Sequence, residues 1–269
     1  MAYGVSVILP GGGINYPTLA GAMYAIDRRV RVGCVTGTSA GGLIASAYAS
    51  GHDLKAAVRM STPLSRHLMR RWAPWRFPPS LYQRPPIRRL LGRILPGTIQ
   101  DVNCDLNVVT ADLVSRKQVI LSSTDPECTL PLADAAYATM AVPGMMPPLR
   151  HNGGLLVDGG ITSNRAVDDV EHPGPKIILV LEDQGPPQRP TTLAEYFGAC
   201  LTTAINHNEA EDMAEGIVIK LPARTDSLDL TALTERQAMR QFAQGYRITY
   251  SKLNPYLAAS LRAFVFARS

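Results

Sequence analysis

Two units of strand, glycine-rich turn and helix follow one another in the first fifty residues, and they constrain the fold more than any other feature. Residues 3–9 are an apolar strand followed by a proline and three glycines, and residues 19–26 then carry a helical apolar face. Residues 30–36 are a second strand, followed by the glycine-rich stretch 37–42 and the helical residues 43–49. This order predicts an α/β fold with a mainly parallel central sheet flanked by helices.

The rest of the chain continues the pattern. Strands are expected at residues 106–110, 118–121, 155–157, 177–181 and 217–221, and helices at residues 132–141 and 231–244. A length of 269 residues suits one large domain, and no linker marks a second one. We therefore expect a single three-layer α/β/α domain over residues 1–269.

The sequence favours a cytoplasmic protein and leaves open export by a route without a cleavable signal. No apolar run reaches the ~18–20 residues that a membrane-spanning helix needs. The first residues lack the basic start of a secretory signal peptide, and we expect them to form the first strand instead. The four cysteines are far apart and form no C-x-x-C pair, which favours a reducing compartment and no zinc site: Cys34, Cys104, Cys128 and Cys200.

The charge of the chain is concentrated in one segment. Residues 54–100 hold ten Lys and Arg and no acidic residue, whereas the rest of the chain holds 17 basic and 22 acidic residues. The segment is also rich in proline, so we expect an irregular excursion over the surface that acts as a cap or lid. Residues 87–95 place apolar side chains at helical spacing, with Arg88, Arg89 and Arg93 opposite. Such a basic amphipathic helix either packs on the core or lies on an anionic membrane surface. No nucleic-acid-binding module accompanies these charges.

The stretch from Gly37 to Gly41 matches G-x-S-x-G, with Ser39 at its centre. It lies between a predicted strand and a predicted helix, which is the context that a nucleophile elbow requires. The glycines would permit a tight turn that exposes the serine hydroxyl. The N-terminus of the following helix would favour an anion formed beside it. The pattern predicts a nucleophilic serine.

Three glycines, Gly11, Gly12 and Gly13, follow the first strand in the same way. Glycine leaves backbone N–H groups accessible, so this loop is a candidate oxyanion hole or phosphate site. A dinucleotide fingerprint would need glycine at the sixth position, where Tyr16 stands, and no G-K-[ST] follows for a P-loop.

A serine nucleophile needs a base, and the sequence offers two answers. The order Ser39, Asp158, His207 would suit a Ser-His-Asp esterase, although only 38 residues precede the serine, fewer than that fold uses. Alternatively, Asp158 itself ends a predicted strand and is followed by Gly159 and Gly160, so its carboxylate is a candidate to take the serine proton directly.

These motifs, in this order, resemble the patatin-like phospholipase family, the serine lipid acyl hydrolases that use a Ser–Asp dyad. The resemblance extends over residues 5–181. It is carried by the glycine loop 11–13, the elbow 37–42, the strand 107–113, the helix and proline turn 138–148, and the aspartate motif 158–160.

The resemblance implies a lipid acyl hydrolase of phospholipase A or lysophospholipase type that needs no metal or other cofactor. Ser39 would be the nucleophile, Asp158 the base, and the backbone of residues 11–13 the oxyanion hole. The implied partners are a phospholipid or other acyl-ester lipid and an anionic membrane, contacted through residues 54–100. The family's glycine loop continues with a basic residue and a glycine, whereas this chain has Asn15 and Tyr16. A catalytically impaired lipid-binding or interaction protein is the remaining alternative.

Overall fold

The computed structural model describes residues 4–68, 84–163, 166, 170–183, 189, 199, 203, 216–224 and 233–266. For residues 62–68, 84–86 and 256–266 it describes the backbone alone. None of the helices within these residues is both long enough and apolar enough to span a membrane.

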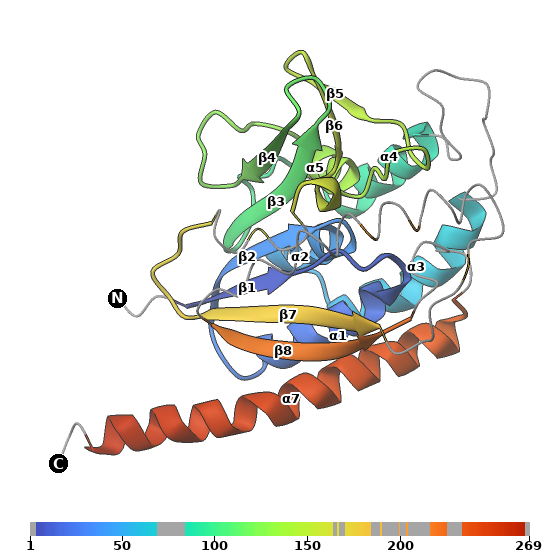
Figure 1. Cartoon of the computed structure of the whole chain (residues 1–269). Helices are drawn as coiled ribbons and strands as arrows, with labels where there is room; N and C mark the ends of the chain where they lie inside the picture. The colour runs from blue at the N-terminus through green and yellow to red at the C-terminus, as the bar shows by residue number, and fades with distance from the viewer. Residues whose placement is uncertain are drawn as a thin grey trace.

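Eight strands form one mixed sheet, in the order β5-β6-β3-β2-β1-β7-β8, with β4 paired to β3 (Figure 1). The strands are β1 (Val5–Leu9), β2 (Val32–Thr38), β3 (Asp105–Asp112), β4 (Lys117–Ser122), β5 (Leu149–His151), β6 (Gly154–Asp158), β7 (Lys176–Asp183) and β8 (Ile217–Ala223). The five neighbouring strands β3, β2, β1, β7 and β8 are parallel, whereas β4, β5 and β6 pair antiparallel. The prediction of a mainly parallel α/β sheet is therefore confirmed for its central strands.

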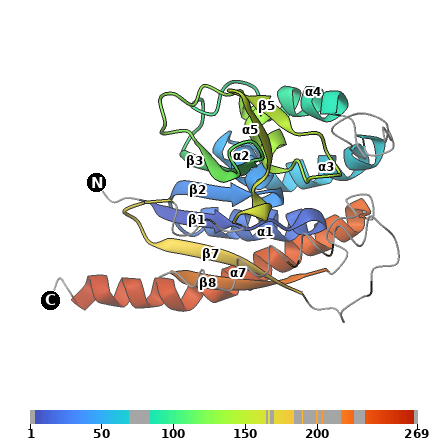
Figure 2. The same ribbon diagram turned by 45° about the horizontal axis from the view of Figure 1, so that its top comes forward.

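Six helices accompany the sheet within the described residues. They are α1 (Tyr16–Asp27), α2 (Ala40–Ala49), α3 (Leu54–Leu68), α4 (Arg84–Ile94), α5 (Leu132–Thr139) and α7 (Glu235–Phe266), with short 3₁₀ helices η1 (Gly13–Asn15) and η2 (Gly159–Ile161). Figures 1 and 2 place α4 and α7 on opposite sides of the molecule. The prediction of flanking helices is confirmed.

The register of β3 brings two distant parts of the chain together. Strand β4 pairs with one edge of β3 over its residues 107–112. On the other edge, the pairing of β2 with β3 ends at Thr38, which lies opposite Val109. The pairing of β6 occupies the next part of that edge, where Asp158 lies opposite Thr110. Since β2 is parallel to β3 and β6 is antiparallel, these two strands end against each other. The residue after Thr38 therefore lies beside Asp158.

Side chains alternate between the two faces of the sheet, so the apolar core has one part on each face. In β1, Val7 and Leu9 belong to the large apolar core that the helices fill, whereas Ile8 points to the other face and packs with Ile178 of β7. This is the period of two expected for a strand buried on both faces.

The prediction of an irregular cap is wrong for residues 54–68, which form α3. Leu54 and Val58 are buried in the core, so this helix is part of the domain's packing. The predicted helix at residues 87–95 is present as α4, and its apolar residues Ile87, Leu91 and Leu95 are also buried. The segment between α3 and α4 lies outside the described residues.

Helix α7 extends much farther than the predicted residues 231–244, and in Figure 1 its C-terminal part runs beyond the sheet. Its first half packs on α1 through glycines. A Cβ atom at Gly21 of α1 would collide with the carbonyl of Phe242, and one at Gly245 of α7 would collide with the carbonyl of Thr18. The two helices thus meet backbone to backbone, and the Tyr24 ring lies 5.6 Å from that of Phe242 beside the contact.

We predict that Gly245→Ala destabilises the protein although alanine is the better helix former. Helix propensity alone would add about 1 kcal/mol to the free energy of unfolding. The collision with Thr18 should outweigh this gain, so that the free energy of unfolding falls by about 1–3 kcal/mol. Gly92→Ala in α4 is the matched control, since a Cβ there meets nothing within 4 Å. Urea unfolding should show Gly92→Ala stabilised; an equally stabilised Gly245→Ala would contradict the close helix contact.

Candidate active site

Ser39 occupies the junction between β2 and α2 in a conformation that non-glycine residues rarely adopt. Its φ is 53° and its ψ is −121°. This positive φ turns the chain sharply out of the sheet, and the side chain remains half-buried rather than covered. The predicted elbow between a strand and a helix is therefore present, with the backbone strain on the serine itself.

Gly37 and Gly41 of the elbow allow close backbone packing, whereas the positive φ is that of Ser39. A Cβ at Gly37 would collide with the backbone of Gly41, and a Cβ at Gly41 would collide with the carbonyls of Leu9 and Pro10. The start of α2 therefore lies directly on the end of β1. This contact places the loop that begins at Gly11 next to the N-terminus of α2.

Asp158 ends β6 and is buried, with only 4% of its surface exposed. The side chain of Ser39 lies beside its carboxyl group, close enough to lower the pKa of Asp158. The N–H of Gly160 donates to Oδ1 at 2.9 Å. Gly159 packs so closely on β3 that a Cβ would collide with the Val109 carbonyl. The structure thus brings together the serine and the aspartate that the sequence singled out.

Burial dominates the electrostatics of this carboxyl group. Loss of solvation raises the pKa of Asp158 to about 6, and the hydrogen bonds from Ser39 and Gly160 oppose that rise. A carboxylate with such a pKa is more basic than a solvated one, yet it is still mostly ionised at pH 7. These are the properties of a general base.

Two contacts from the end of α5 were not foreseen from the sequence. The Thr139 hydroxyl accepts the N–H of Ser39 at 2.8 Å and donates to the Val109 carbonyl at 2.6 Å. Two residues later, the Ala141 carbonyl accepts the N–H of Asp158 at 3.1 Å. A threonine at the end of an alanine-rich helix matches no catalytic motif, so only the structure reveals these bonds.

The glycine loop continues into residues with structural contacts. The Asn15 Oδ1 atom accepts the backbone N–H of Arg224 at 2.8 Å, so its amide ties the loop to the end of β8. The Tyr16 hydroxyl lies 2.7 Å from that of Ser61 in α3, and burial raises the pKa of this tyrosine. Asn15 and Tyr16, the two residues that differ from the family's glycine loop, thus both make structural contacts.

Two of the described histidines bond to backbone groups away from Ser39 and Asp158. His52 Nε2 bonds to the Ile94 carbonyl at 2.6 Å, and His172 Nδ1 accepts the N–H of Gly174 at 3.0 Å. His207, the histidine of the alternative Ser-His-Asp hypothesis, lies outside the described residues. Within the described ranges, no group of three or more His, Cys, Asp or Glu side chains is arranged to hold a metal ion.

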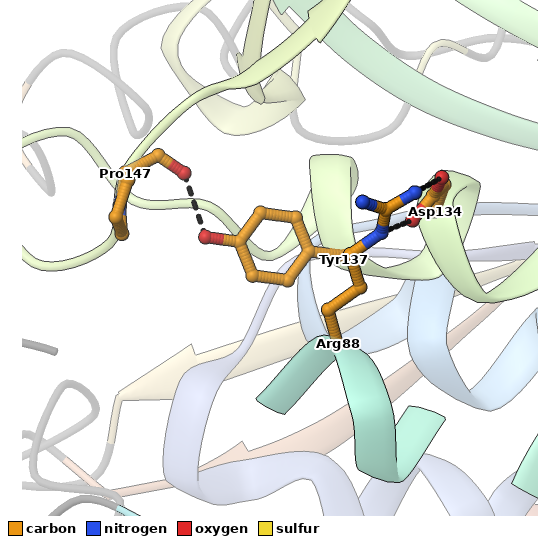
Figure 3. A network of polar contacts seen from close by, with 4 residues as sticks. All are labelled: Arg88, Asp134, Tyr137 and Pro147. Atoms are coloured by element: carbon orange, nitrogen blue, oxygen red, sulfur yellow. Dashed lines mark hydrogen bonds and ion pairs between the residues drawn. The ribbon is translucent and has the colours of Figure 1, made fainter. Parts of the chain in front are cut away.

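Helix α5 is held at its other end by α4. The Arg88 guanidinium pairs with both oxygens of Asp134, a buried residue in the first turn of α5 (Figure 3). One turn later, the Tyr137 hydroxyl donates to the Pro147 carbonyl at 2.7 Å. Arg88, Arg89 and Arg93 are all exposed, and Arg88 differs in that it also pairs with the buried Asp134.

Sequence comparison identifies the family. The profile described as Patatin-like phospholipase matches residues 7–170, which is more than half of the chain and includes both Ser39 and Asp158. The chain belongs to the patatin-like phospholipase family. The resemblance inferred from the motifs is thereby confirmed.

Other patatin-like proteins match at low identity. A patatin-like phospholipase domain-containing protein of Caenorhabditis elegans is 26% identical over 204 residues, covering 71% of this chain and 18% of the relative. The lysophospholipase NTE1 of Candida albicans is 22% identical over 193 residues, covering 66% of this chain and 13% of the relative. The chain thus spans less than a fifth of the length of either protein.

Two solved structures share the fold. VipD from Legionella pneumophila superposes with a TM-score of 0.58 at 14% identity, covering 94% of this chain and 67% of that one. ExoU, in its complex with SpcU from Pseudomonas aeruginosa, superposes with a TM-score of 0.50 at 15% identity, covering 93% of this chain and 51% of that one. At these identities the similarity establishes the fold.

The raised pKa of Asp158 predicts a stability effect. The folded protein holds this proton more tightly than the unfolded chain, so the wild type loses stability as the pH rises from about 4 to about 6. Asp158→Asn does not titrate. Its free energy of unfolding relative to wild type should therefore increase by about 3 kcal/mol between pH 4 and 7, and stay constant above.

Urea unfolding at pH 4 to 8 measures this difference. Asp101→Asn is the control of opposite sign, because the N–H and hydroxyl of Thr98 lower the pKa of the exposed Asp101. A difference between Asp158→Asn and wild type that does not vary with pH would contradict the burial of this carboxyl group.

Proposed function

We propose that the protein is a lipid acyl hydrolase of phospholipase A or lysophospholipase type, which cleaves fatty-acyl esters with Ser39 as nucleophile and Asp158 as base. The observation that carries this proposal is the placement of a serine held at positive φ beside a buried carboxyl group of raised pKa. Membership of the patatin-like phospholipase family supports lipid esters as the substrate class.

In the first half of the reaction, the Ser39 Oγ attacks the ester carbonyl carbon while Asp158 takes the hydroxyl proton. The carbonyl electrons move onto oxygen and form a tetrahedral oxyanion. Collapse of this intermediate restores the carbonyl and breaks the bond to the alcohol oxygen. That oxygen takes the proton from Asp158, and an acyl-serine remains.

In the second half, water attacks the acyl-serine carbonyl as Asp158 accepts a water proton. Collapse releases the fatty acid, and the Ser39 oxygen takes the proton back. The same carboxyl group therefore serves as base and acid in both halves. A pKa of about 6 suits both roles near neutral pH.

We assign the oxyanion donors to backbone N–H groups of the Gly11–Gly13 loop and the first turn of α2. The packing of Gly41 on Leu9 and Pro10 supports this assignment, because it holds the loop beside the helix N-terminus. The helix dipole adds a favourable field for the developing negative charge.

The first prediction for this function is covalent labelling by a fluorophosphonate. Wild type should gain the mass of one adduct, and Ser39→Ala should gain none. Asp158→Asn should react about 100-fold more slowly, since a general base contributes roughly that much or more. The wild-type rate should rise with pH around a midpoint near pH ~6 and level off about one pH unit higher, where the carboxylate is ionised.

Intact-mass spectrometry measures these rates. Ser50→Ala, at the other end of α2, is the matched serine control and should label as wild type does. His207→Ala should also label normally; its failure would favour the Ser-His-Asp esterase. Absence of any adduct on folded wild type would overturn the hydrolase and favour a lipid-binding relative without activity.

We further propose that the exposed face of α4 contacts anionic lipid headgroups. The apolar side of α4 is buried in the core, so insertion of that side into a bilayer is not available to the folded protein. Arg89 and Arg93 lie one turn apart and are exposed, and no acidic residue occurs between residues 54 and 100. Their contribution is therefore electrostatic and should weaken with salt.

This contact predicts that Arg89→Ala/Arg93→Ala weakens binding to vesicles rich in phosphatidylserine. Each arginine near such a surface contributes about 1 kcal/mol, so the double variant should bind about tenfold or more weakly at low salt. Arg236→Ala/Arg240→Ala in α7 is the matched control, with two exposed arginines at the same spacing on the other side of the molecule. Vesicle sedimentation should separate the two variants; equal losses would reject α4 as the contact.

A further inference from the structure

We propose that Thr139 is the positioning residue of the nucleophile: its hydroxyl holds the backbone of Ser39 in the strained conformation that presents the side chain to Asp158. This inference rests on the proposed function and deepens it. It concerns how the serine is kept in place, for which neither the motifs nor the family resemblance names a residue.

The first support is the pair of hydrogen bonds that Thr139 makes where β2 leaves the sheet. Thr38 is the last residue of β2 to pair with β3, opposite Val109. The next N–H, that of Ser39, donates to the Thr139 hydroxyl, which in turn donates to the Val109 carbonyl. One hydroxyl thus bridges the two backbones at the point where their own pairing ends.

The second support is the burial of this bridge. Thr139 has no exposed surface, so water cannot replace its hydroxyl there. A buried N–H without a partner is costly, and the cost falls on the conformation of Ser39, whose φ of 53° is already unfavourable. The hydroxyl therefore stabilises the conformation that the elbow needs.

The third support is steric. A Cβ atom at Gly42 would lie 2.6 Å from the Thr139 methyl carbon and 2.9 Å from its hydroxyl oxygen. Glycine at position 42 thus allows the threonine to reach the elbow across the first turn of α2. Gly42 follows the G-x-S-x-G motif, and this contact accounts for it.

The end of α5 also reaches the other member of the proposed dyad, since the Ala141 carbonyl accepts the Asp158 N–H. Helix α5 itself is fixed by Arg88 at its first turn and by the bond from Tyr137 to Pro147, as Figure 3 shows. One anchored element therefore holds the backbones of both residues. Helix α5 and the residues just after it thus support the relative position that β3 gives to Ser39 and Asp158.

A chemical consequence follows for the oxyanion. Because the Ser39 N–H is engaged by Thr139, it does not supply a donor to the tetrahedral intermediate. The donors then come from N–H groups after Ser39 and from the glycine loop. Thr139 acts on the reaction through the serine and does not itself contact the substrate.

The test compares Thr139→Val with Thr139→Ser. Valine keeps the branched shape and removes the hydroxyl, whereas serine keeps the hydroxyl and removes the methyl group. With a soluble p-nitrophenyl ester, Thr139→Val should lower kcat and the fluorophosphonate labelling rate about 10- to 100-fold with KM unchanged. Thr139→Ser should stay within about threefold of wild type.

Thr249→Val in α7 is the matched control. Thr249 is equally buried, and its hydroxyl finds no partner in the described part of the chain, so its loss should leave kcat unchanged. Each variant is assayed well below its melting temperature, so that a fall in kcat does not reflect unfolding. If Thr139→Val does not fold, Thr139→Cys, whose thiol is a weaker partner, should show an intermediate loss.

Hydrogen exchange of the Ser39 amide gives a readout that does not depend on hydrolysis. The amide should be protected in wild type and Thr139→Ser and should exchange faster in Thr139→Val. Normal labelling by folded Thr139→Val, or an unchanged Ser39 amide, would overturn the positioning role. Failure of wild type to label at all would instead reject the proposed hydrolase, and the catalytic part of this inference with it.

Discussion

Two strands that run in opposite directions end against each other on one edge of β3, and the arrangement of the candidate site depends on this meeting. Val109 and Thr110 are consecutive, yet they pair with the ends of β2 and β6. Neither strand can continue without colliding with the other. The chain leaves β2 at Ser39 through a positive φ, and it leaves β6 at Asp158 through a 3₁₀ turn. A serine and an aspartate 119 residues apart in sequence thereby become neighbours.

This geometry has an energetic cost that the surroundings offset. A carboxyl group is desolvated, and a serine is held in a rare conformation. Backbone contacts on glycines bring β1, α2 and η2 close to the strand ends. Hydrogen bonds with Thr139, Ala141 and Gly160 satisfy the N–H groups of Ser39 and Asp158 and one oxygen of the Asp158 carboxyl group. Many of these contacts are made by backbone that already forms part of the sheet or a helix.

The sequence predicts those features of the fold and site that local residue patterns determine. Strand–glycine–helix order gives the parallel centre, and the motifs locate Ser39 and Asp158. Register is not a local property, so the meeting of β2 and β6 and the bridge through Thr139 could not be predicted. The proline-rich sequence does not predict α3, because proline usually breaks a helix, yet Pro63 lies within α3. In α4, Pro85 and Pro86 occupy the first turn, where proline is tolerated.

Because the glycine loop carries no charged side chain, stabilisation of the proposed oxyanion depends on backbone N–H groups and on the helix dipole. In this chain, the position where the family's loop carries a basic residue holds Asn15, whose side chain is bonded to the backbone of Arg224. A fixed cation at that position would stabilise an oxyanion, but it would also lower the pKa of a nearby buried carboxyl group. Without that cation, burial outweighs the opposing hydrogen bonds from Ser39 and Gly160, and Asp158 remains a stronger base. In the proposed mechanism, the departure in the loop would favour proton transfer over stabilisation of the oxyanion. It would leave the helix N-terminus and the loop N–H groups as the counterpart of the negative charge.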